Sequence, residues 1–263
     1  MGARTKPLGS GAIADAIAAL AQGNRIVFVP IYDDNPLKYI RFQYVTLTII
    51  AINVAVFVFE SLGLDQAVIA SFAINPRELM EARVLGPHSS HTHDVFPLPE
   101  RYTLLTYMFF HGDIVHIFGN MLFLWVFGDN VEDAMGHVRF AIFYVACGVF
   151  AGLTHAFVQP GSTIPLIGAS GAVAGVIAAY LMLHPRIRVW VLALKFIPLR
   201  ISAMFVLGAW ILTQVVMLVM PQTGPVAWWA HIGGLVAGAL LVTVMRRPGV
   251  PLFDKDRVSA PVI

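Results

Sequence analysis

The stretch Ala227–Met245 reads AWWAHIGGLVAGALLVTVM, and its only ionisable side chain is that of His231. A run of about 20 mostly apolar residues is long enough to cross the hydrocarbon core of a bilayer as a helix. The stretch therefore predicts a membrane span with a histidine near one end. Gly234 and Gly238 lie four residues apart. Small residues at this spacing let helix backbones approach closely.

The composition of the whole chain agrees with a membrane protein. Of its 263 residues, 58% are apolar and 12% are charged, and the mean hydropathy is +0.76. Soluble domains carry about 25% charged residues, so an ordinary cytosolic enzyme and a disordered chain are both poor fits. The only cysteine, Cys147, excludes a disulfide framework. A net charge of +2 is too small to indicate a nucleic-acid partner. The partner that the composition does predict is the lipid bilayer.

Five further apolar runs predict additional spans. They lie near Tyr44–Leu64, Ile114–Val131, Val138–Val158, Ser170–His184 and Ile201–Met220. None of them alternates strictly between apolar and polar residues, which disfavours a β-barrel. We therefore predict an all-α polytopic membrane protein with a bundle of six transmembrane helices. The predicted division is an amino-terminal segment (1–43), the six-helix domain (44–245, with an outer loop at about 65–113) and a carboxy-terminal tail (246–263).

The basic residues predict the orientation, because Lys and Arg concentrate in cytoplasmic segments. With the amino terminus in the cytoplasm, 14 of the 17 basic residues lie on that side: Arg4, Lys6, Arg25, Lys38, Arg41, Arg139, Arg186, Arg188, Lys195, Arg200, Arg246, Arg247, Lys255 and Arg257. Both termini are then cytoplasmic. Ala12–Ala21 fits a short helix or a disordered arm better than a signal peptide. Without a transit-type leader or a span before the core, we expect a multi-pass protein of a bacterial inner membrane.

Polar side chains within spans are rare and usually functional. Four of them fall within the first two turns of spans that run in the same direction: His116 and Asn120 in the second span, Ser170 at the start of the fourth, and His231 in the sixth. With a rise of about 1.5 Å per residue, all four are expected at a similar depth in the outer half of the bilayer. His155 and Gln214 are also polar. We interpret these two as interhelical packing residues.

The glycines predict which spans meet. Gly171 and Gly175 follow Ser170 directly, and the second G-x-x-x-G pair begins three residues after His231. Packing these two faces together would bring the serine hydroxyl to the imidazole. The alternative is that both glycine pairs have a purely structural role in tight helix packing.

These residue types favour nucleophilic catalysis. A serine hydroxyl becomes a strong nucleophile when a neighbouring base takes its proton, and His231 is the candidate base. No carboxylate has a context that ties it to His231, so the sequence predicts a dyad. Backbone N–H groups at the helix start, with His116 and Asn120 one turn apart on a single face, are candidate donors to a developing oxyanion.

Three motifs occur in order on the second, fourth and sixth spans: His111-Gly112-Asp113 with His116-x-x-x-Asn120, Gly168-Ala169-Ser170-Gly171, and Ala230-His231-x-x-Gly234-x-x-x-Gly238. G-x-S-G alone is a weak signal, but all three in this order are highly specific. Over about Arg101–Met245 the chain resembles the rhomboid family of intramembrane serine proteases.

The resemblance implies a six-helix bundle whose Ser170–His231 dyad opens to the extracytoplasmic side, with an oxyanion hole made by the Ser170 N–H, His116 and Asn120. It implies a serine endopeptidase, without a cofactor, that cleaves transmembrane segments of other membrane proteins. It also implies that the fifth span and Pro221–Pro225 act as lateral gate and cap. Some family members carry a Tyr where this chain has Ala174, so another group must orient His231. Trp228 and Trp229 are the candidates.

Three alternatives remain open at this point. A rhomboid-like protein could bind client transmembrane helices without cutting them, although such relatives generally lack the nucleophile or the base. The outer-loop residues His88, His91, His93 and Asp94 suggest a metal site. Their spacing matches no known ligand pattern, and the chain has no H-E-x-x-H, so we predict no metal. A transporter would need paired charges at mid-membrane or internal repeats, and neither is found.

Overall fold

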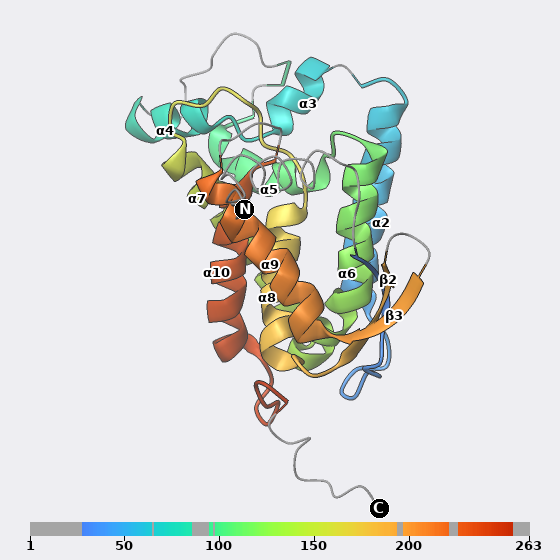
Figure 1. Cartoon of the computed structure of the whole chain (residues 1–263). Helices are drawn as coiled ribbons and strands as arrows, with labels where there is room; N and C mark the ends of the chain where they lie inside the picture. The colour runs from blue at the N-terminus through green and yellow to red at the C-terminus, as the bar shows by residue number, and fades with distance from the viewer. Residues whose placement is uncertain are drawn as a thin grey trace, which may run out of the picture.

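The computed structural model of the chain describes residues 28–64, 66–85, 95–96, 98–193, 197–220 and 226–254. Within these residues four helices are long and apolar enough to cross a membrane: α2 (Tyr44–Ser61), α6 (Ile114–Met135), α7 (His137–Val158) and α10 (Trp228–Met245). Two shorter apolar helices, α8 (Ser170–Leu183) and α9 (Ala203–Val219), pack with them. These six helices correspond to the six predicted spans, and the predicted helical membrane bundle is confirmed (Figure 1).

Helix α8 lies at the centre of the bundle. It contacts α6, α7, α9 and α10, and most of its side chains are buried. Its 14 residues rise only about 21 Å, whereas the hydrocarbon core of a bilayer is about 30 Å thick. One end of α8 must therefore lie below the membrane surface. A helix end at that depth needs protein around it, because lipid cannot satisfy its free backbone groups.

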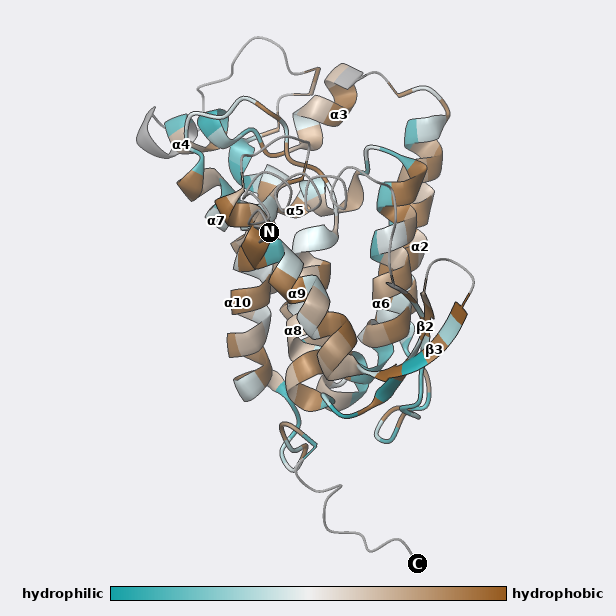
Figure 2. Cartoon of the chain, viewed as in Figure 1, coloured by the Kyte–Doolittle hydropathy of each residue, from teal (hydrophilic) through white to brown (hydrophobic). Residues whose placement is uncertain are grey.

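The core consists mainly of side chains from α6, α7 and α8 and from the segment before α6, and α2, α9, α10 and the sheet add further residues. Its largest fully buried members include Tyr107, Phe127, Phe140, Phe143, Tyr144 and Tyr180. Large apolar side chains are also exposed on the outer faces of the helices, among them Phe118, Ile142 and Leu240. Figure 2 shows that hydrophobic residues line the length of the bundle and that hydrophilic residues concentrate at its two ends. An exposed apolar belt between two polar ends is typical of a lipid-facing surface.

The predicted outer loop folds into short helices at one end of the bundle, which we call the loop end (Figure 1). Its elements are α3 (Gln66–Phe72), α4 (Pro76–Leu85), η1 (Glu100–Tyr102), α5 (Thr103–Thr106) and η2 (Tyr107–Phe109). An isolated bridge between Ile74 and Leu166 ties this region to the segment that leads into α8. Outside the described residues lie Ala12–Ala21 and the outer-loop residues for which we predicted no metal, His88, His91, His93 and Asp94.

A small antiparallel sheet lies at the opposite end, which we call the basic end. Its strands are β1 (Phe28–Asp33), β2 (Arg188–Ala193) and β3 (Ile197–Ser202), in the order β1-β2-β3. The register pairs Arg188 with Ser202, and a bulge interrupts the β1–β2 pairing between Pro30 and Tyr32. Sequence reasoning did not foresee the sheet. Strands of six residues give too little alternation to be recognised in the sequence.

Candidate active site

Ser170 and His231 are neighbours at the loop end. Ser170 is the first residue of α8, and His231 lies in the first turn of α10. The Oγ atom of Ser170 is 2.8 Å from Nε2 of His231, which is hydrogen-bonding distance. The imidazole is 8% exposed, whereas Ser170 is only partly buried. A serine bonded to a buried imidazole and still reachable from outside is the arrangement that nucleophilic catalysis requires.

Close contact between α8 and α10 brings these two side chains together. A Cβ atom on Gly234 would collide with the carbonyl oxygen of Gly171, and one on Gly238 would collide with that of Gly175. A Cβ on Gly175 would also lie 2.5 Å from Sγ of Cys147 on α7. The two glycine pairs therefore lie in one interface, and no larger residue fits there without moving a helix.

His116 packs against Gly168 in the segment that leads to Ser170. It lies in the first turn of α6, where the carboxylate of Asp113 caps the helix by accepting hydrogen bonds from the N–H groups of Val115 and His116, both at 2.8 Å. Gly168 has φ +122°, and a Cβ on it would lie 2.7 Å from the His116 ring. Only glycine combines this backbone conformation with so close an approach. The imidazole therefore lies against the backbone two residues before Ser170.

Asn120 lies one turn further along α6 and is 7% exposed. Its Nδ2 atom is buried and has no hydrogen-bond partner among the described residues. An unpaired buried donor costs about 1–3 kcal/mol, so folded proteins rarely keep one without a reason. A buried donor of this kind is available to an oxygen of a bound molecule.

Sequence reasoning missed the partner of His231. The Oε1 atom of Gln214, on α9, is 2.7 Å from Nδ1 of His231. The sequence indicated only that Gln214 was a buried polar residue in an apolar helix, which was taken for interhelical packing. Its contact with the imidazole depends on how α9 leans against α10, and no spacing along the chain shows that.

His111 links α2 to Ala169, the residue before Ser170. Its backbone N–H donates to the Glu60 carboxylate at 3.3–3.4 Å, and its Nε2 accepts from the N–H of Ala169 at 3.4 Å. Burial, aided by the nearby His116, lowers the pKa of His111 to about 4. The ring is therefore neutral at pH 7, as an acceptor of an N–H bond must be.

The rings next to His231 are those of Trp228 and Trp210, with centroids 6.0 and 5.9 Å away. Of the two tryptophans expected to orient the imidazole, Trp228 is the one in ring contact. Ala174 is fully buried. His155 is also buried, and its Nδ1 has no hydrogen-bond partner among the described residues. The expected cap, Pro221–Pro225, lies outside those residues.

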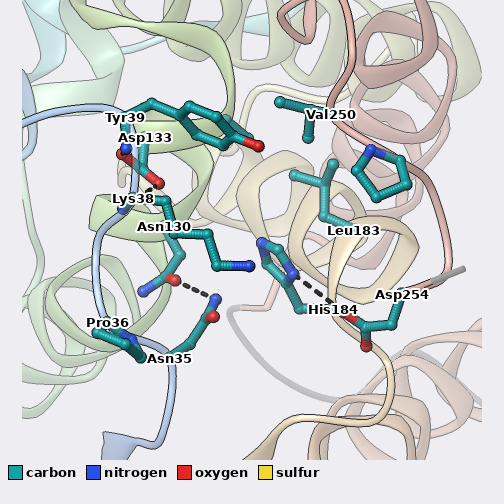
Figure 3. A pocket seen from close by; sticks show the side chains of 12 residues that line it. Asn35, Pro36, Lys38, Tyr39, Asn130, Asp133, Leu183, His184, Val250 and Asp254 are labelled. Carbon is teal, nitrogen blue, oxygen red and sulfur yellow. Dashed lines mark hydrogen bonds and ion pairs between the residues drawn. The ribbon is translucent and has the colours of Figure 1, made fainter. Parts of the chain in front are cut away.

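No carboxylate among the described residues bonds to His231 as a third catalytic member. Glu60 lies at the loop end but bonds to the backbone N–H of His111. Asp129, Glu132 and Asp133 are at the basic end, where a cavity of about 210 Å³ opens between the segment before α2, α6, α8 and the segment after α10 (Figure 3). Asn35, Lys38 and His184 line this cavity with Asp133. The cavity is therefore separate from the Ser170–His231 pair, with the length of α8 between them.

The fold and the site together define a class of protein. It is a polytopic helical membrane protein in which a serine at the start of the central helix α8 bonds to a histidine in the first turn of α10. The particular family follows from comparison with known sequences. Residues 99–248 match the Rhomboid domain, and the chain belongs to the rhomboid family.

Three relatives illustrate the similarity. RHOMBOID-like protein 6, mitochondrial, of Arabidopsis thaliana is 27% identical over 224 residues, covering 75% of this chain and 67% of the relative. The human presenilin-associated rhomboid-like protein, mitochondrial, is 28% identical over 173 residues, or 60% of this chain and 43% of the relative. Rhomboid protease GluP of Bacillus subtilis is 28% identical over 170 residues, or 62% and 30%. The chain thus spans less than half of the human and Bacillus proteins.

The comparisons contradict the expected bacterial inner membrane. Most of the relatives found are named as mitochondrial, and a further one, Rhomboid-like protein 11 of Arabidopsis thaliana, is named as chloroplastic. These relatives point to an organellar membrane. The prediction was wrong because it rested on the lack of a recognisable transit-type leader or preceding span, and neither feature identifies the membrane that holds the bundle.

Proposed function

We propose that this protein is an intramembrane serine endopeptidase of an organellar membrane, with Ser170 as nucleophile and His231 as general base. The observation that carries the proposal is the 2.8 Å separation of Ser170 Oγ and His231 Nε2. The catalytic unit is the six-helix domain at 44–245, and the substrates are transmembrane segments of other membrane proteins. The similarity to a relative named as a rhomboid protease supports the reaction type.

In the first half of the reaction, Oγ of Ser170 attacks the carbonyl carbon of the scissile bond while its proton passes to Nε2 of His231. Negative charge develops on the carbonyl oxygen. The donors available for it are Nδ2 of Asn120, the ring of His116 and the backbone N–H of Ser170, which no helical bond satisfies at a first helical position. The C–N bond then breaks, and the imidazolium gives its proton to the leaving amine.

In the second half, a water molecule hydrolyses the acyl ester. His231 takes a proton from the water, the resulting hydroxyl attacks the acyl carbon, and Ser170 recovers its proton as the ester bond breaks. Water must reach this point inside a membrane protein. The partial exposure of Ser170 and the shortness of α8 both favour a site recessed from the loop end and open to water there.

A transmembrane substrate must reach the serine from the lipid and must expose its backbone. Helix α9 is the natural entrance, since only four of its 17 residues are buried. Because a helical peptide bond is inaccessible to Oγ, residues that weaken the substrate helix near the cut are expected to favour cleavage.

The test is covalent labelling by a fluorophosphonate probe in liposomes, combined with cleavage of a model transmembrane substrate. We compare the wild type with Ser170→Ala and His231→Ala at matched folded fractions. Loss of labelling and cleavage in both variants is the expected result. Labelling that survives Ser170→Ala would reject this nucleophile. A folded wild type that binds the substrate helix and neither reacts nor cleaves would favour the non-catalytic, helix-binding alternative.

A further inference from the structure

Helix α9 buries few side chains, and one of them is polar. Its buried residues are Ala203, Val206, Leu207 and Gln214. The three apolar ones lie in its first five residues, so Gln214 is the only buried side chain in the remainder of the helix. It is 3% exposed. Burying an amide in a membrane helix is costly unless its hydrogen-bonding groups find partners.

Both ends of this amide have a partner, and together they fix its orientation. Nε2 of Gln214 donates to the carbonyl oxygen of Trp210 at 2.9 Å, and Oε1 lies 2.7 Å from Nδ1 of His231. Rotating the amide by 180° would place Oε1 against the Trp210 carbonyl oxygen. Two acceptors would then face each other, and the donor to Trp210 would be lost. Only the first orientation satisfies the backbone carbonyl.

The orientation of the amide determines where His231 carries its proton. Because Oε1 can only accept, Nδ1 must carry a hydrogen. In a neutral imidazole the other nitrogen is then unprotonated, so Nε2 accepts from Oγ of Ser170 at 2.8 Å. This is the tautomer that a general base needs. In serine hydrolases with a catalytic triad, the carboxylate of the third residue selects it. The neighbouring Trp210 and Trp228 rings limit where the imidazole lies, but they offer no acceptor to Nδ1.

On the basis of the proteolytic function proposed above, we propose that Gln214 is the positioning residue of the active site. Its side-chain carbonyl holds His231 in the Nδ1–H tautomer and aims Nε2 at Ser170. It supplies what the buried methyl group of Ala174 cannot. His231 is thereby hydrogen-bonded to α9. Apart from Gln214, the buried side chains of that helix all lie in its first five residues.

The experiment compares four variants on one helix. Gln214→Met keeps the length of the side chain and removes the acceptor. Gln214→Asn keeps an amide that is too short to reach Nδ1. Gln214→Glu keeps an oxygen acceptor at the same reach. The matched control is Thr213→Val, because Thr213 is exposed and its hydroxyl makes the same kind of bond to a carbonyl four residues earlier, that of Ala209 at 3.0 Å.

The readouts are kcat and KM for a transmembrane substrate in liposomes and the rate of fluorophosphonate labelling. A positioned general base contributes about 10²–10⁴-fold to rate, so we expect Gln214→Met and Gln214→Asn to lower kcat and the labelling rate about 10–100-fold with KM nearly unchanged. Gln214→Glu should recover most of both rates, and Thr213→Val should match the wild type. If Gln214→Met does not fold, the Asn and Glu variants make the same comparison.

Two failures are distinguishable. Wild-type kcat and labelling in the Met and Asn variants, with Ser170→Ala inactive, would overturn the role of Gln214 and leave the proteolytic function intact. Equal losses in the Glu and Met variants would also overturn it, because the acceptor would then not be what matters. Labelling that persists in Ser170→Ala would instead reject the proposed function itself.

Discussion

The two ends of the bundle are both polar inside, but they differ in charge. At the loop end the buried imidazole and amide side chains of His231, Asn120 and Gln214 surround the partly buried hydroxyl of Ser170. At the basic end they are carboxylates, including Glu132 and Asp133, which are 0% and 5% exposed. Helix α6 contributes to both clusters, so the two environments are built on the same element.

The carboxylates of the basic end hold neighbouring segments in place. Glu132 accepts from the N–H groups of Val45 and Thr46 at 3.0 and 2.8 Å, where α2 begins. Asp133 accepts from the N–H groups of Lys38, Tyr39 and Ile40 at 2.6–2.9 Å. Figure 3 shows Asp133 beside the cavity, with Asn130 bonded to Asn35 and His184 bonded to Asp254. Charge-assisted bonds to several N–H groups are among the strongest that proteins make.

The difference between the ends separates stability from reactivity. The carboxylates of Glu132 and Asp133 at the basic end are matched by donors, so they stabilise the fold. At the loop end Nδ2 of Asn120 is buried and unmatched among the described residues, and a donor in that state lowers stability. Mutations at the loop end should therefore lower kcat with little loss of stability, and mutations at the basic end should lower stability with little change in kcat.

The largest expected effect is on the rate at the loop end. Ser170→Ala and His231→Ala should each lower kcat/KM by about 10⁴-fold or more, and the double variant should cost no more than either single one, because the two groups act as a unit. Thermal unfolding in detergent should change little. Cleavage assays on the three variants would measure this, and additive losses would contradict a shared proton transfer.

Asn120 and Asn130 allow a direct comparison of the ends, since both are buried on α6. Asn120→Leu should lower kcat about 10²–10³-fold, as loss of one oxyanion donor does. Its stability should stay level or rise, because an unpaired donor is removed. Asn130→Leu breaks the bond to Asn35 and should cost about 1–2 kcal/mol of stability at unchanged kcat. Reversed outcomes in unfolding and cleavage measurements would reject the division between the ends.

Glu132 tests the basic end alone. Glu132→Ala leaves the N–H groups of Val45 and Thr46 without their acceptor. We expect a loss of about 2–4 kcal/mol in the free energy of unfolding, with kcat per folded molecule unchanged. Asp113→Ala is the control at the loop end, because Asp113 caps α6 from an exposed position. It should cost only about 1 kcal/mol. Similar costs for both variants in denaturant titrations would contradict this prediction.

Much of the bundle could be predicted because apolar runs have to match the thickness of a bilayer. The helical bundle followed from those runs. The candidates Ser170, His231, His116 and Asn120 followed from polar residues at a common depth. The structure brings Ser170 and His231 within hydrogen-bonding distance, although their catalytic role stays a prediction.

What could not be predicted depends on lateral packing. Gln214 meets His231 because of how α9 leans on α10, and no periodicity along α9 reports that angle. The strands β1 and β2 pair although more than 150 positions separate them in the chain. The sequence places Glu132 and Asp133 at a helix end but does not show what they bind, since their partners come from a distant segment of the chain. The membrane itself was mispredicted because the lack of a recognisable leader does not identify a compartment.

The smallest expected effect comes from Asp33, at the basic end in β1. Burial raises the pKa of this carboxyl from 3.8 to about 7, although the hydroxyl of Tyr180 donates to it. The folded state then binds more protons than the unfolded state between about pH 4 and pH 7, so the contribution of Asp33 to stability falls as the pH rises through this range. Between pH 6 and pH 8 the loss is about 1 kcal/mol. Asp33→Asn should remove this slope, so the stability difference between variant and wild type should grow toward pH 8. Parallel stability–pH curves for the two proteins would show that Asp33 does not titrate with folding.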